Sequence, residues 1–174
     1  GTNPISDIWS LKAMEMVARY IVRAVSDPND EEARSRMILA SAFAGMGFGN
    51  AGVHLPHAMS YPVSSRVRGF KPEGFVGDHP IIPHGMSVVL NAPAVFRFTG
   101  PACPERHLRA AEALGADISG VRNPQEEAGR VLADRIVAIV KQLEMPNGLK
   151  AVGFTREDIP ALVAGTLPQH RVTK

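Results

Sequence analysis

The sequence predicts an all-α protein, and three observations support this fold class. Apolar residues recur every three or four positions along several segments, which is the period of an amphipathic helix. Several of these segments begin with proline or acidic residues, as first turns of helices often do. No segment alternates apolar and polar residues well enough for a strand. The helices are expected at residues 6–24, 31–46, 56–61, 85–98, 104–114, 124–143 and 155–165.

The first two expected helices have distinct characters. Ser6 or Asp7 is expected to cap the first. The second follows a capping stretch over 26–30 and opens with two glutamates, whose charges suit the positive end of a helix. Its far half is nearly all small or apolar, so we expect it to be buried on most sides.

Prolines set the expected boundaries in the middle of the chain. Pro56 is tolerated only near a helix start, so a short helix is expected there and should end before Pro62. His57 would then lie close to a helix N-terminus. Residues 64–83 are expected to form an irregular loop, and loops of this length are often functional.

Helical character returns after His84, although Pro93 should kink or split that helix. Two further helices are expected to start at Pro104 and Pro124. The last is expected to begin at Thr155, where the segment Thr-Arg-Glu-Asp supplies a cap and an acidic first turn.

The composition bounds the class of protein. A chain of 174 residues with 45% hydrophobic content suits one domain with its own core. The 19 basic and 17 acidic residues are spread along the chain, so we expect no nucleic-acid partner. No apolar run is long enough for a membrane span and no signal peptide is evident, so we expect no membrane association. The single Cys103 suits a reducing compartment such as the cytoplasm, as a packing or loop residue.

The chain opens on Gly-Thr-Asn-Pro, without an initiator methionine, and enters a helical pattern almost at once. These features suggest an excised piece of a longer protein. A purification scar also explains Gly1.

Histidines gather in one segment. Imidazole is the commonest metal-binding side chain, and a catalytic metal needs several ligands that converge. The three-residue spacing of His54 and His57 is weak evidence by itself, because capping or packing histidines share it. His84 strengthens the metal hypothesis, since Pro83 stiffens the backbone before it and Gly85 leaves room after it. The clustered histidines are His54, His57, His79 and His84.

The other histidines carry weaker expectations. His79, between Asp78 and Pro80, is expected to be a loop histidine that bonds a neighbour. His107 and His170 occupy helical or terminal contexts that we expect to be solvated.

Several motifs resemble a known family. The segments Asn50-Ala-Gly52, His57-Ala-Met59 with Pro62, and Pro83-His84-Gly85 resemble the metal-binding part of the iron-containing (group III) alcohol dehydrogenases. The family pattern is N-A-G-x-x-x-x-H-[GA]-M-x-x-P, followed by P-H-G at the next helix. The resemblance covers essentially the whole chain. Segments that resemble the hydroxyacid-oxoacid transhydrogenase branch are 3–9, 52–55, 60–62, 78–80 and 158–168.

This resemblance implies the helical C-terminal domain of a dehydroquinate synthase-like fold, with residues 1–174 as a single metal-binding domain. The family's other domain, which binds NAD, would lie outside the chain, so no NAD-binding residue is assigned. The metal would be Fe²⁺, with Zn²⁺ as the other candidate, held usually by one Asp and three His. His57 and His84 match the last two histidines, and the other two ligands would precede the chain.

The sequence departs from the family pattern in two places. Many members have a histidine four residues after the first of these ligands, where this chain has Tyr61, and the loop between the ligands is longer here. A phenol cannot replace imidazole as a proton carrier near neutral pH. We take Tyr61, which occupies the position of that histidine, and His54 as the catalytic candidates. His54 would take over part of the proton-carrying role.

The resemblance implies oxidation of a hydroxyacid such as 4-hydroxybutyrate by hydride transfer to NAD, with 2-oxoglutarate as acceptor. Arg66, Arg68 or Lys71 would pair with substrate carboxylates. Residues 1–174 alone are expected to be inactive. A homo-oligomer is expected, and the compartment would be the mitochondrial matrix in a eukaryote.

Two alternatives remain at this stage. A non-catalytic helical interaction module with structural histidines would keep its partner after chelation and after His57→Ala. A metal hydrolase of helical-bundle type would need a carboxylate within reach of both imidazoles, and Asp78 is the only nearby candidate.

Overall fold

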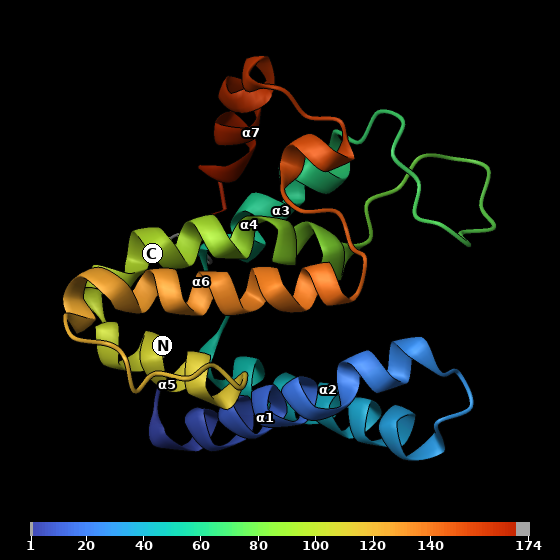
Figure 1. The fold of residues 1–174 in the computed structure, drawn as a ribbon. Helices are drawn as coiled ribbons and strands as arrows, with labels where there is room; N and C mark the ends of the chain where they lie inside the picture. The colour runs from blue at the N-terminus through green and yellow to red at the C-terminus, as the bar shows by residue number, and fades with distance from the viewer. Residues whose placement is uncertain (1, 170–174) are drawn as a thin grey trace. The chain divides into compact units, whose positions relative to one another are not determined.

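A computed structural model describes residues 2–169 and confirms the all-α prediction, since this part of the chain holds no strand (Figure 1). Single 3₁₀ turns lie at Gly100–Ala102, Leu149–Val152 and Arg156–Asp158. None of the helices described is by itself long and apolar enough to cross a bilayer. The helices are α1 (Pro4–Ser26), α2 (Glu31–Ala51), α3 (Leu55–Ser65), α4 (His84–Thr99), α5 (Pro104–Ala113), α6 (Pro124–Gln142) and α7 (Ile159–Thr166).

The described chain divides into two compact units. The first unit comprises residues 2–52 and 96–144, with α1, α2, α5 and α6. The second unit comprises residues 53–95 and 145–169, with α3, most of α4, and α7.

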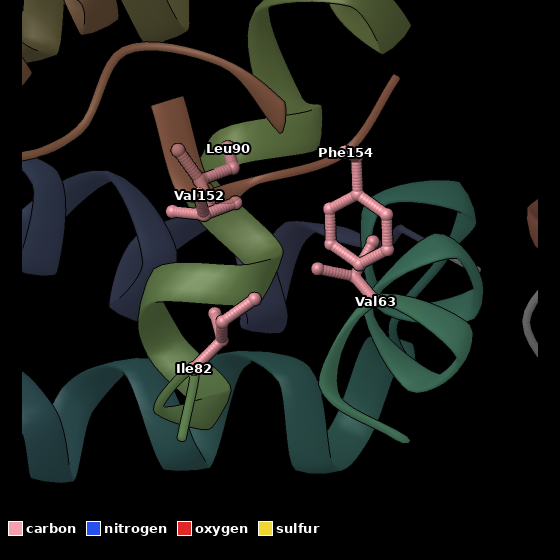
Figure 2. Packing of buried hydrophobic residues seen from close by; sticks show 5 residues of the cluster. All are labelled: Val63, Ile82, Leu90, Val152 and Phe154. Carbon is pink, nitrogen blue, oxygen red and sulfur yellow. The ribbon is translucent and has the colours of Figure 1, made fainter. Parts of the chain in front are cut away.

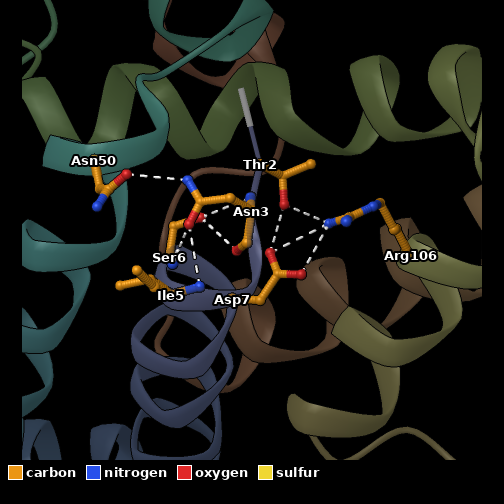
Figure 3. Close-up of polar contacts among 7 residues, drawn as sticks. All are labelled: Thr2, Asn3, Ile5, Ser6, Asp7, Asn50 and Arg106. Atoms are coloured by element: carbon orange, nitrogen blue, oxygen red, sulfur yellow. Dashed lines mark hydrogen bonds and ion pairs between the residues drawn. The ribbon is translucent and has the colours of Figure 1, made fainter.

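In the first unit, α1 starts earlier than predicted because Asn3, not Ser6 or Asp7, caps it. The Asn3 side chain accepts hydrogen bonds from the N–H groups of Ile5 and Ser6, and the Ser6 hydroxyl oxygen accepts the N–H of Asn3 in return (Figure 3). Asn3 Nδ2 also donates to Asn50 Oδ1 at 3.0 Å, which ties the start of α1 to the end of α2.

The predicted burial of α2 is wrong. Ile38 is 75% exposed and Phe48 is 52% exposed. The reason is that α2 packs along one side only, against α1, through a narrow seam of small residues. A Cβ added at Gly47 would lie 2.3 Å from Ser10 Oγ, so glycine is required for this close approach.

The prediction that His107 is solvated is also wrong. This ring is 6% exposed, and its Nε2 lies 2.9 Å from Thr99 Oγ1. Position 107 shares a face of α5 with the fully buried Ala111, one turn later, and that face packs on α6. Cys103 is the half-buried N-cap residue of α5. His170 lies outside the described residues.

The core of the second unit joins the elements that carry the clustered histidines. Figure 2 shows five side chains that pack together, each at most 8% exposed. Val63 comes from α3 and Ile82 lies two residues before the start of α4, so burial of these side chains fixes the two helices against each other. The five are Val63, Ile82, Leu90, Val152 and Phe154.

Two prolines interrupt their helices less than predicted. α3 runs on through Pro62 to Ser65, and α4 passes Pro93 without a split. At Pro62 the lost backbone bond is offset by burial, since Gly165 of α7 packs so closely that an added Cβ would lie 2.6 Å from Pro62 Cβ. The capping box of Thr155 is confirmed, although its first turn is 3₁₀ and α7 begins at Ile159.

Candidate metal centre

The second unit brings His57 and His84 together. His57 is the third residue of α3, and His84 is the first residue of α4. Their ring centres lie 5.4 Å apart, with the ring planes inclined by 58°. His57 is half-buried and His84 is exposed, so the pair lies at the surface of the unit.

This separation suits a shared cation. A metal–imidazole bond of about 2.1 Å puts each ring centre about 3.2 Å from the ion, so two rings at a tetrahedral angle have centres about 5.2 Å apart. The spacing of His57 and His84 is close to this value. The donor set fits two positions of one divalent ion and leaves the others to further ligands.

The protonation of His57 favours the same chemistry. Partial burial lowers the pKa of the His57 imidazole, and the neighbouring rings of His84 and His54 lower it further. The neutral ring, which has a free lone pair for a metal, therefore persists to lower pH than in an ordinary histidine.

Both catalytic candidates of the sequence lie near this pair. Tyr61, one turn after His57 on α3, stacks beside His84 with ring centres 6.4 Å apart and planes inclined by 29°. His54 is the exposed N-cap residue of α3, and its carbonyl oxygen accepts the N–H of His57 at 2.9 Å.

The sequence prediction missed two serines. The Ser60 hydroxyl donates to the carbonyl oxygen of His57, and the Ser87 hydroxyl donates to that of His84, both at 2.7 Å. Both serines are 0% exposed. The signal that could have found them is the shared order His–small–Met–Ser, at 57–60 and 84–87.

In the described part of the chain, no third side chain joins the two histidines as a ligand. Within residues 2–169 no group of three His, Cys, Asp or Glu side chains is placed to hold a metal ion. Asp78, which is fully exposed and lies 3.4 Å from His79, forms no such group with His57 and His84 among these residues, so it does not complete the site that a hydrolase would need.

The basic loop residues have different surroundings. Arg68 forms an ion pair with Asp158, whose side chain is only 10% exposed. Lys71 lies over the Phe75 ring, 5.9 Å from its centre. Arg66, the C-cap residue of α3, is exposed.

The whole chain, residues 1–174, matches the family model described as "Fe-containing alcohol dehydrogenase family, C-terminal". It is 58% identical over all of its length to the mitochondrial hydroxyacid-oxoacid transhydrogenases of Xenopus tropicalis and Homo sapiens. A probable mitochondrial hydroxyacid-oxoacid transhydrogenase of Dictyostelium discoideum is 55% identical. The chain spans 37% of the first two proteins and 32% of the third.

Solved structures show the same fold. A 1,3-propanediol oxidoreductase superposes with a TM-score of 0.83 at 26% identity, over 98% of this chain and 41% of that one. The sulfoacetaldehyde reductase of Bifidobacterium kashiwanohense, solved in complex with NAD⁺, superposes with a TM-score of 0.75 at 27% identity, over 99% of this chain and 39% of that one.

Proposed function

This chain belongs to the Fe-containing alcohol dehydrogenase family, and on that premise we propose that it is the metal-binding helical domain of an NAD-dependent oxidoreductase acting on hydroxyacids. The adjacent imidazoles of His57 and His84 carry this proposal. They hold Fe²⁺, with Zn²⁺ as the other candidate, and further ligands and most of the NAD site come from sequence beyond residues 1–174.

The cation, when bound, acts as a Lewis acid that stabilises negative charge on the reacting substrate oxygen. The chain's own residues orient the reactants around it. Tyr61 lies one turn after His57 on α3 and its ring stacks beside His84, which suits its phenolic hydroxyl to hydrogen-bond the substrate. His54 is the nearby exposed imidazole that exchanges the alcohol proton with solvent.

The names of the relatives support the choice of substrate. We propose a hydroxyacid such as 4-hydroxybutyrate as hydride donor and an oxoacid such as 2-oxoglutarate as acceptor, on cofactor that stays bound between the two half-reactions. A homo-oligomer is proposed, with the mitochondrial matrix as its location in a eukaryote and the cytoplasm otherwise.

The test compares the full-length protein with its His57→Ala, His84→Ala and His79→Ala variants. Metal content after dialysis and hydride transfer from 4-hydroxybutyrate to 2-oxoglutarate are measured. His57→Ala and His84→Ala are expected to lose the ion and about a thousandfold or more in rate, because a Lewis-acid metal supplies several kcal/mol. His79→Ala, which changes an exposed loop histidine, is expected to retain both.

Retention of the ion and of wild-type turnover by His57→Ala would contradict the metal assignment. Oxidation of simple alcohols with free NAD, without transfer to an oxoacid, would instead contradict the transhydrogenase reaction.

A further inference from the structure

We infer that Ser60 and Ser87 are positioning residues that hold the peptide groups of His57 and His84, so that both imidazoles stay directed at one cation. The inference rests on the proposed metal site. It is carried by a matched pair of hydrogen bonds, in which each serine hydroxyl donates to the carbonyl oxygen of the histidine three residues earlier, at 2.7 Å in both helices.

Both serine hydroxyls are buried, where a polar group is unfavourable without a hydrogen-bond partner. Ser60 and Ser87 are 0% exposed, and burying a hydroxyl is unfavourable unless it is hydrogen-bonded. Alanine, which has no hydroxyl, would avoid that cost. The same device appears twice, in the segments His57-Ala-Met-Ser60 and His84-Gly-Met-Ser87, and both times it acts on a histidine of the proposed site.

The histidines lie where a helix backbone needs support. His57 and His84 are in the first turns of α3 and α4, where carbonyl oxygens accept intrahelical bonds but N–H groups have no intrahelical partner, so each peptide group is held by fewer bonds than at mid-helix. The hydroxyl of the serine one turn later therefore adds a hydrogen bond to the carbonyl oxygen of each histidine. With the backbone held, only the two side-chain torsions of each ring are left to place its ligand nitrogen.

Further buried bonds extend this support around His84. Asn91, 2% exposed, donates from Nδ2 to the carbonyl oxygen of Ser87 at 2.7 Å. The N–H of Ser87 donates to Pro83 O at 2.9 Å. From α3, the Ser64 hydroxyl donates to Ile82 O at 3.3 Å, two residues before His84. These bonds join the start of α4 both to its own next turns and to the helix that carries His57.

The chain supplies a matched control. Ser65, at the end of α3, makes the same kind of bond to a carbonyl three residues earlier, that of Pro62, at 3.4 Å. It is exposed and its acceptor is not a proposed ligand. Ser65→Ala thus removes an exposed hydroxyl with the same bonding pattern without touching a histidine.

The experiment uses the full-length protein loaded with Co²⁺, and it measures the rate of metal transfer to a chelator together with the visible Co²⁺ absorption spectrum. Ser60→Ala and Ser87→Ala are each expected to release the ion about tenfold faster and to alter the spectrum, the lower end of the effect of outer partners of metal ligands. Ser65→Ala is expected to match the wild type, and Ser87→Thr, which keeps the hydroxyl, to stay closer to it than Ser87→Ala.

A second measurement needs no variant. In the metal-free wild-type protein, the amides around His57 and His84 are expected to resist hydrogen exchange already, because the serines hold them before metal arrives. Fast exchange that slows only after metal addition would overturn the inference, as would wild-type release rates in both alanine variants. If His57→Ala holds Co²⁺ as tightly as the wild type, the metal site itself is wrong.

Discussion

The two units differ in where they place their polar side chains. In the first unit the ion pairs of Arg23 with Asp30 and Glu32, and of Arg97 with Asp134, leave about half of each arginine exposed. Its buried polar side chains, Ser6 and His107, serve a helix cap and the packing of α5. In the second unit, buried hydroxyl and amide groups line the two helices that begin near the histidines. Exposed ion pairs contribute little to stability, whereas a buried polar group matters for what it holds in place.

The two units are therefore expected to respond differently to mutation. The first unit resembles a scaffold of long helices, α1, α2 and α6, and its mutations should reduce stability alone. The second unit carries the proposed chemistry on the short α3 and the first turn of α4, so its mutations should also reduce metal retention. Variants of the full-length protein test this contrast.

The largest expected effect comes from the two cores. Phe154→Ala should lower the free energy of unfolding by about 3–5 kcal/mol, because it leaves a cavity at a side chain that is 5% exposed. Leu132→Ala, at 3% exposure in the first unit, should cost about 2–5 kcal/mol. Urea unfolding measures both. Only Phe154→Ala should speed metal release, so equal release from the two variants would remove the contrast between the units.

A close backbone contact in the first unit gives the next effect. A Cβ at Gly129 would lie 2.4 Å from Phe96 O, so Gly129→Ala should cost about 1–3 kcal/mol through overpacking. Gly45→Ala on α2 is the control, because nothing lies within 4 Å of its added Cβ. Higher helix propensity should make that variant neutral or slightly more stable in thermal unfolding. Destabilisation of equal size in both would rule out the steric explanation.

Removal of a helix cap has a smaller consequence. Asn3→Ala should destabilise the protein by about 1 kcal/mol, since it leaves N–H groups of the first turn of α1 without their acceptor. Asn29→Ala, in the exposed turn between α1 and α2, should change the thermal midpoint less. Metal retention is expected to stay unchanged in both.

The smallest effect concerns pH. The pKa of the Asp158 carboxyl is lowered, mainly because the carboxylate accepts a hydrogen bond from the N–H of Thr155. Burial of the carboxyl raises this pKa, and the charge of Arg68 lowers it. A lowered carboxyl pKa adds stability above the unfolded value of about 3.9, and that stability is lost as the pH falls through the folded pKa. Arg68→Ala should therefore destabilise the protein slightly near neutral pH, with a cost that shrinks below about pH 4.

Urea unfolding at several pH values measures this difference, with Arg66→Ala as the neighbouring control. A cost of Arg68→Ala that persists unchanged at pH 3 would show that the ion pair does not stabilise the second unit.

Local signals in the sequence predicted much of the fold. α5 and α6 start at Pro104 and Pro124 as expected, because proline fixes a conformation that suits a helix start. Capping was harder, since Asn3, Ser6 and Asp7 are all good caps and only the path of the backbone decides among them. The burial of His107 depends on a neighbouring helix, which no periodicity within α5 identifies.

For the candidate site, too, local sequence signals predicted the helix starts but not the contacts between helices. The starts of the two histidine helices followed from Pro56 and Pro83, but the meeting of the rings depends on packing between segments far apart in sequence. The family resemblance, rather than spacing, paired His57 with His84 before the structure did. The role inferred for the two serines required both their burial and their hydrogen-bond partners, and sequence alone provides neither.

One contact in the loop between α3 and α4 has a practical consequence. The N–H of Ile81 donates to Phe70 O at 2.9 Å, so the residues between them leave and return at a single closed neck. Extra residues inserted beyond that neck, for example at the exposed Gly74, need not alter the spacing of the helices that the loop connects. This part of the loop is thus a suitable place to graft an epitope or attach a fluorophore. Its length can also vary between related enzymes without moving the two helices.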